Sequence, residues 1–185
     1  MGAGADHICG GCLSSRRHFD AARAALVYEG AGRELIHAFK YRNKTHLRRP
    51  LALMTVERLS AFIASQAPEL IVPVPLHRKR LRSRGFNQAL LLGEIFSSHW
   101  KIPLERYNLR RIRWTEPQVN LSACDRRSNV KGAFSIKDSS RICGRRVLLV
   151  DDVLTTGSTV EECAVLLKSA GAVEVTVITV ARALA

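Results

Sequence analysis

Two periodicities of hydrophobic residues alternate along this chain of 185 residues. Runs of consecutive apolar residues predict strands, and apolar residues spaced three or four positions apart predict amphipathic helices. The strand-like runs cover residues 21–28, 70–75, 146–150 and 173–180. The helical patterns cover residues 34–41, 50–65, 88–99 and 158–170. Because strands and helices alternate, we predict an α/β fold with a mostly parallel central sheet flanked by helices.

The segments between these elements complete the expected organisation. A turn is expected at residues 30–32, and the prolines at 73 and 75 indicate an edge or the end of the strand there. Residues 101–131 are polar and basic with little periodicity, which predicts either a functional loop or part of a hairpin. We divide the chain into a short Cys-containing segment, residues 1–20, and one domain, residues 21–185.

The segment with the clearest chemistry begins at residue 147. Residues 147–150 are wholly apolar, as in a strand buried on both faces. Asp151 and Asp152 end this run, at the carboxyl end of the strand, where open α/β sheets bind ligands. Thr155-Thr-Gly-Ser-Thr159 follows, and its hydroxyl and backbone N–H groups suit a phosphate at the start of the next helix. Carboxylates for sugar hydroxyls beside a phosphate-binding turn predict a ribose-phosphate site.

An ordinary helix cap is the competing interpretation of the same segment. Ser158 or Thr159, followed by Glu161 or Glu162, would cap a helix without binding a ligand. Two adjacent acids directly after a wholly apolar strand, with Thr-Thr-Gly-Ser-Thr in register, form a more restrictive pattern than a cap requires. We therefore favour the ribose-phosphate site.

Composition sets the class of protein and the charge of its partners. A hydrophobic content of 46% is typical of a folded globular protein. No apolar run approaches the roughly 20 residues that span a bilayer, and the first residues lack the pattern of a secretory signal, so we expect a cytoplasmic protein. The net charge of +13 favours polyanions, either a small molecule that carries pyrophosphate or a nucleic acid.

The five cysteines do not indicate a disulfide framework. Cys9 and Cys12 have the spacing of half a zinc site, and only His7 and His18 lie nearby to complete it. Three interpretations stay open for this pair: a partial zinc site, two free thiols, or a metal shared between chains.

Several further segments carry a resemblance to a known family. Arg80-Leu-Arg-Ser-Arg-Gly-Phe-Asn-Gln88 and Thr115-Glu-Pro-Gln-Val-Asn-Leu121 resemble the ComF/GntX-like branch of the phosphoribosyltransferase superfamily. The same is true of Arg126/Arg127, Asn129 and Gly132-Ala-Phe134, and of residues 36–41 together with the Val-Pro-Val-Pro strand. The resemblance covers residues 27 to 182. The family typically begins with a four-cysteine zinc module, whereas here only Cys9 and Cys12 are present, so the chain is either shortened at its start or has lost the metal.

The resemblance implies a type I phosphoribosyltransferase-like fold with a hood, and a site for phosphoribosyl pyrophosphate (PRPP) and Mg²⁺. In that family the acids would hold the ribose hydroxyls, and the hydroxyl-rich turn would hold the 5-phosphate. The implied PRPP-binding residues are Asp151, Asp152, Thr155, Thr156, Gly157, Ser158 and Thr159. The loop after Pro75 would face the leaving diphosphate, through Leu76, His77, Arg78 and Lys79.

The function that the resemblance implies is transfer of ribose 5-phosphate from PRPP to an unidentified, nucleobase-like acceptor. Residues 110–134 are the candidate hood, with Gln118 and Arg126 or Arg127 reaching inward to assist Asp151 and Asp152; a solvated basic loop is the alternative. The same branch is associated with natural competence and DNA uptake. The competing functions are therefore a factor that handles single-stranded DNA, with a competence-machinery protein as partner, and a non-catalytic PRPP sensor.

Overall fold

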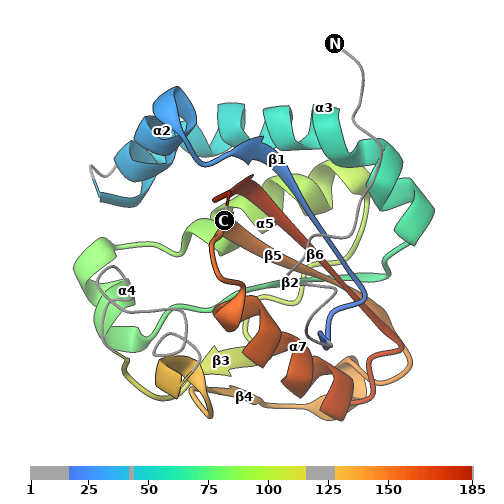
Figure 1. Ribbon diagram of the computed structural model, residues 1–185. Coiled ribbons are helices and arrows are strands. Elements are labelled where there is room, and N and C mark those ends of the chain that lie inside the picture. Colours follow the sequence, from blue (N-terminus) through green and yellow to red (C-terminus); the bar gives the residue numbers. More distant parts are fainter. Residues whose placement is uncertain (1–16, 42–43, 116–127, 185) are drawn as a thin grey trace.

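A parallel sheet forms the centre of the protein. The computed structural model describes residues 17–41, 44–115 and 128–184, and within these ranges four strands pair in the order β1–β6–β5–β2 (Figure 1). These strands are β1 (Ala21–Val27), β2 (Leu70–Pro73), β5 (Arg146–Leu154) and β6 (Glu174–Arg182). All three pairings are parallel, which confirms the predicted α/β class. The proline-containing β2 lies at an edge, where a missing N–H costs no ladder hydrogen bond.

Helices cover both faces of the sheet (Figure 1). One face packs against α2 (Gly30–Tyr41), α3 (Arg48–Gln66) and α5 (Gln88–Trp100). The other face packs against α7 (Ser158–Ser169) and a hairpin of β3 (Leu109–Arg111) and β4 (Phe134–Ile136). None of the helices in the described ranges has the length and apolar character needed to cross a membrane.

The alternation of side chains along β5 explains the two hydrophobic cores. Leu148 and Val150 belong to the core beneath α3 and α5, and Val147 and Leu149 to the core beneath α7. Because successive side chains of a strand point to opposite faces, a strand in the middle of two layers must be apolar at every position. The next residue of β5, Asp151, therefore begins the polar part of both faces.

Three element boundaries differ from those expected. The helix α2 begins at Gly30, so the expected turn at residues 30–32 is its first turn. The strand β5 continues through both acids to Leu154, because β6 stays paired with it as far as Arg182. The segment 101–131 contains β3, and its partner β4 lies just beyond, which confirms the hairpin alternative for the part of this segment that the structure describes.

A short basic helix, which the sequence pattern did not predict, completes the fold. This helix, α4 (Arg78–Arg84), follows β2 and ends at Gly85, immediately before α5. Figure 1 shows α4 beside the carboxyl ends of β2 and β5, and its sequence, Arg-Lys-Arg-Leu-Arg-Ser-Arg, is rich in cations.

Candidate functional site

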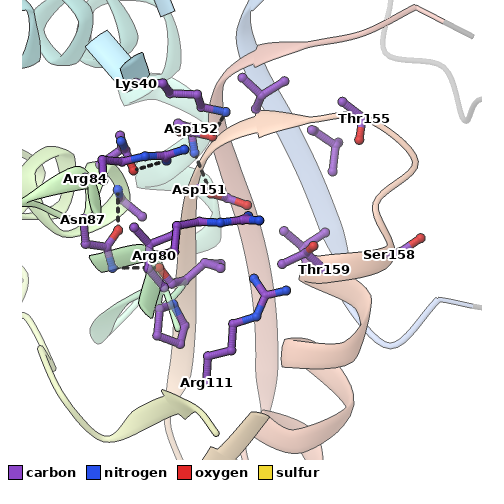
Figure 2. A pocket seen from close by; sticks show the side chains of 18 of the residues that line it. Lys40, Arg80, Arg84, Asn87, Arg111, Asp151, Asp152, Thr155, Ser158 and Thr159 are labelled. Atoms are coloured by element: carbon purple, nitrogen blue, oxygen red, sulfur yellow. Dashed lines mark hydrogen bonds and ion pairs between the residues drawn. The ribbon is translucent and has the colours of Figure 1, made fainter. Parts of the chain in front are cut away.

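A cavity of about 920 Å³ opens at the carboxyl ends of β2 and β5. Its walls come from α2, α4, the start of α5, the end of β3 with the residues that follow it, and the β5–α7 turn. Figure 2 shows acids at its centre, arginines on one side and hydroxyl groups on the other. Four segments distant in sequence (residues 28–41, 74–89, 111–114 and 151–160) therefore meet around one space that combines both signs of charge.

The two central acids have different surroundings. Figure 2 shows Asp152 facing Lys40 of α2, and its Oδ1 lies 2.7 Å from Lys40 Nζ. Burial alone would lower the pKa of Lys40, but the Asp152 carboxylate outweighs it and raises the pKa. Asp151 accepts a hydrogen bond of 2.8 Å from the backbone N–H of Asp152. Burial, assisted by the neighbouring Asp152 charge, raises the pKa of Asp151 from 3.8 to about 7.

Hydroxyl groups of the β5–α7 turn form the opposite wall. Gly157 has φ +78°, a left-handed conformation that lets the chain turn sharply into α7. The hydroxyls of Thr156 and Ser158 lie 2.9 Å apart. Thr155 and Thr159 also line the cavity, beside the first turn of α7. Backbone N–H groups at the start of a helix, together with hydroxyl donors, form a binding site for a phosphate-type anion.

Guanidinium groups occupy the remaining wall. Arg84 donates a hydrogen bond of 2.9 Å to the Oε1 atom of Gln88, and Arg111 donates one to Thr115 Oγ1. Arg80 lines the cavity between them (Figure 2). The Nε2 group of Gln88 is buried and has no partner among the described residues. The wall therefore presents donors to any ligand with several anionic oxygens.

The structure places the predicted site residues unequally. Asp151, Asp152, Leu76 and the whole turn from Thr155 to Thr159 line the cavity. His77, Arg78 and Lys79 are not among the described residues that line the cavity. His77 caps α4 by accepting a hydrogen bond from the backbone N–H of Lys79, and its ring contacts Trp114. Gln118, Arg126, Arg127, Cys9 and Cys12 lie outside the described residues, so their roles stay predictions.

Five basic residues of the site were not among the predicted ones: Arg33, Lys40, Arg80, Arg84 and Arg111. Arg80 and Arg84 are four positions apart on α4, so recognition of this short helix would have placed both on one face. Lys40 gave no such signal, because its role depends on the way in which α2 packs over β5.

The described residues of the cavity can be compared with what the implied Mg²⁺ ion requires. Within the described ranges, no group of three or more His, Cys, Asp or Glu side chains is arranged to hold a metal ion. Mg²⁺ usually binds through one or two carboxylates, water and phosphate oxygens of a substrate. Asp151 and Asp152 fit this smaller role, so the residues present suit a Mg²⁺ ion that arrives with a diphosphate.

Comparison with known proteins identifies the family. Residues 28–185 match the family described as the phosphoribosyl transferase domain. Competence protein F of Haemophilus influenzae is 39% identical over 179 residues, covering 95% of this chain and 78% of the relative. DNA utilization protein YhgH of Escherichia coli K12 is 36% identical over 172 residues, covering 91% and 75%.

Among solved structures, adenine phosphoribosyltransferase from Thermoanaerobacter pseudethanolicus aligns with a TM-score of 0.45 and 16% identity, covering 76% of this chain and 83% of that one. The family match spans most of the residues that form the sheet and the cavity. The chain therefore belongs to the phosphoribosyltransferase superfamily, as a member of its ComF-type branch.

Proposed function

We propose that the cavity binds PRPP together with Mg²⁺ and transfers ribose 5-phosphate to a nucleobase-like acceptor. One observation carries this proposal: a single cavity joins a carboxylate pair, a hydroxyl-rich turn at a helix N-terminus and four guanidinium groups, those of Arg33, Arg80, Arg84 and Arg111. A ligand that satisfies all three must carry sugar hydroxyls and anionic groups at both ends. PRPP has these groups in that order.

Each wall then has a distinct role in the transfer. The β5–α7 turn binds the 5-phosphate, and Asp151 accepts hydrogen bonds from the ribose hydroxyls. The bond between the anomeric carbon and the diphosphate oxygen breaks with its electron pair going to the diphosphate, and an acceptor nitrogen attacks from the opposite face and loses its proton. Arg80, Arg84 and Arg111 stabilise the negative charge that grows on the leaving diphosphate.

Positioning and exclusion of water account for the rest of the catalysis, since no covalent intermediate with the protein is needed. Mg²⁺, when bound, would neutralise the diphosphate and make it a better leaving group. Gln118 and Arg126 lie outside the described residues, and their catalytic role stays a prediction.

Calorimetric titration with PRPP in the presence of Mg²⁺ tests the proposal. We expect saturable binding by the wild-type protein and affinity about tenfold or more weaker for Asp151→Asn, because a charged acceptor of ribose hydroxyls is lost. Asp152→Asn is a poorer first test, since it also leaves the buried Lys40 without its partner. Folded wild-type protein that does not bind PRPP, or Asp151→Asn that binds as tightly as wild type, would reject the proposal.

Catalysis is separated from simple sensing by the release of pyrophosphate. Incubation of PRPP-bound protein with a panel of nucleobases should release pyrophosphate with at least one acceptor if the protein is an enzyme. Tight PRPP binding with no release for any acceptor would favour the sensor.

A second candidate function is the handling of single-stranded DNA. The relatives are named for competence and DNA utilization, and the outer face of α4 exposes Arg78, Lys79 and Arg82 to solvent. An exposed cationic row binds the phosphates of nucleic acids without reading their sequence. This surface is distinct from the cavity lining, so the two functions can be tested separately.

A further inference from the structure

Of the four arginines that line the cavity, three lie over an aromatic ring. The Cζ atom of Arg84 is 5.0 Å from the ring centroid of Tyr41, at the end of α2. The Cζ atom of Arg80 is 5.5 Å from the centroid of Trp114, just beyond β3. The Cζ atom of Arg111 is 5.2 Å from the centroid of Phe134, in β4. Three separate elements therefore supply one ring for each guanidinium group.

These contacts fix side chains that are otherwise flexible. A free arginine side chain has about 2 kcal/mol of rotamer entropy to lose when it binds a ligand. The ring beneath Arg84 and the hydrogen bond to Gln88 restrict this freedom before a ligand arrives. A site whose donors are already in place binds more tightly than one that must order them.

The cavity arginines lie close enough together to repel one another. Burial, followed by the nearby charge of Arg80, lowers the pKa of Arg111. Within the described ranges, neither Arg84 nor Arg111 forms a salt bridge with a carboxylate. The charge of Asp151 offsets part of this repulsion on Arg111, and the ring contacts help to hold the guanidinium groups where they are. A ligand with several negative charges at the guanidinium wall offsets the repulsion between the arginines. A ligand with a single phosphate, bound at the β5–α7 turn on the opposite wall, does not.

We propose that Tyr41 and Trp114 are positioning residues, which give the cavity its preference for a ligand with a diphosphate over one with a single phosphate. They act by holding Arg84 and Arg80 in place on the wall opposite the β5–α7 turn. This inference rests on the proposed function, because it assigns the diphosphate of PRPP to the guanidinium wall.

Tyr41 and Trp114 are also suitable positions for substitution. Their exposed fractions are 59% and 37%, whereas Phe134 is only 4% exposed and belongs to the hydrophobic core. Changes at the two exposed rings should therefore leave the fold intact. Tyr107 is a matched control, because it is 67% exposed and lies outside the cavity.

The test measures dissociation constants for PRPP, ribose 5-phosphate and inorganic pyrophosphate by calorimetry. The variants are Tyr41→Leu, Trp114→Leu, the conservative changes to Phe at both positions, and Tyr107→Leu. Each change to Leu in the cavity should weaken PRPP and pyrophosphate binding about three- to tenfold, the range expected for a lost cation–π contact. Ribose 5-phosphate binding should change less than about twofold, and the Phe variants should retain most of the affinity.

The three ligands separate failure of this inference from failure of the proposed function. Equal losses for PRPP and ribose 5-phosphate would show a general disturbance of the site and overturn the inference. Unchanged PRPP affinity in both Leu variants, or equal losses in the Phe and Leu variants, would overturn it as well. If wild-type protein binds pyrophosphate but neither sugar phosphate, a loss of pyrophosphate binding in the Leu variants supports the inference while the proposed function fails. Protein that binds none of the three ligands overturns both.

Discussion

At the scale of single residues, the pair Asp151 and Asp152 shows how neighbouring acids acquire different properties. Asp152 is buried and its charge is balanced by Lys40. For Asp151, burial and the neighbouring Asp152 charge outweigh the charges of Lys40 and Arg111 and raise the pKa to about 7. The unfolded chain therefore loses the Asp151 proton near pH 4, whereas the folded protein keeps it until about pH 7. As the pH rises between these values, the free energy of unfolding falls.

The substitution Asp151→Asn tests the direction of this pH dependence of stability. Asparagine cannot ionise, so the variant should be more stable than wild type at pH 8, by on the order of 2 kcal/mol after allowance for the partial exposure of this side chain. Near pH 4.5 the difference should be much smaller. Urea unfolding at both pH values measures it. An equal gain at the two pH values, or a loss at pH 8, would contradict the assignment. The same variant should bind PRPP poorly, which would show that the acid is kept for function at a cost in stability.

At the scale of elements, the β5–α7 turn depends on the left-handed conformation of Gly157. An added Cβ atom would meet Leu154 at 3.7 Å, an ordinary contact, so the strain of alanine there comes from φ and not from crowding. We expect Gly157→Ala to cost about 1 kcal/mol of stability and to weaken ribose 5-phosphate binding roughly tenfold as the turn shifts.

Gly144 is the matched control, because it has φ +74° and open space around its Cβ position, away from the cavity. Gly144→Ala should lose a similar amount of stability but should bind ribose 5-phosphate as tightly as wild type. Thermal unfolding measures the loss of stability, and calorimetric titration measures the loss of binding. An equal loss of binding in both variants would argue against a specific role for Gly157.

The same scale shows what the sequence could and could not predict. The parallel sheet was predictable because β5 and β6 are apolar on both faces, and the acids and turn at the end of β5 were predictable because they follow in unbroken sequence. The cationic wall was not, since Lys40 reaches Asp152 only through the packing of α2 across 112 positions of the chain. The loop after Pro75 was assigned to the diphosphate from the family resemblance. The structure adds α4, whose helical period turns Arg80 and Arg84 toward the cavity and Arg78 toward solvent.

At the scale of the whole molecule, the net charge of +13 includes two cationic surfaces, the cavity wall and the outer face of α4. Coulomb attraction at long range depends on the total charge, and both surfaces therefore favour the approach of polyanions. Stable binding depends on local geometry. The cavity arginines converge on a small volume, as a compact ligand requires, whereas the exposed face of α4 presents separate charges, as a phosphate backbone requires.

Two double substitutions on α4 separate these surfaces, because they remove the same charge from opposite sides of one helix. Arg80→Ser/Arg84→Ser should abolish most PRPP binding, since two cavity donors are lost. Arg78→Ser/Arg82→Ser should leave PRPP affinity within about twofold of wild type. It should weaken binding of single-stranded DNA and reduce the magnitude of the slope of log K against log salt by about 1.4, since two cations are removed. Calorimetry with PRPP and fluorescence anisotropy with a labelled oligonucleotide at several salt concentrations provide the measurements. If the outer pair also weakens PRPP binding, the diphosphate extends to the residues directly after Pro75, as the resemblance implies. If neither pair changes the salt slope, the cationic face of α4 is a solvated surface, and the charge of the protein serves the cavity.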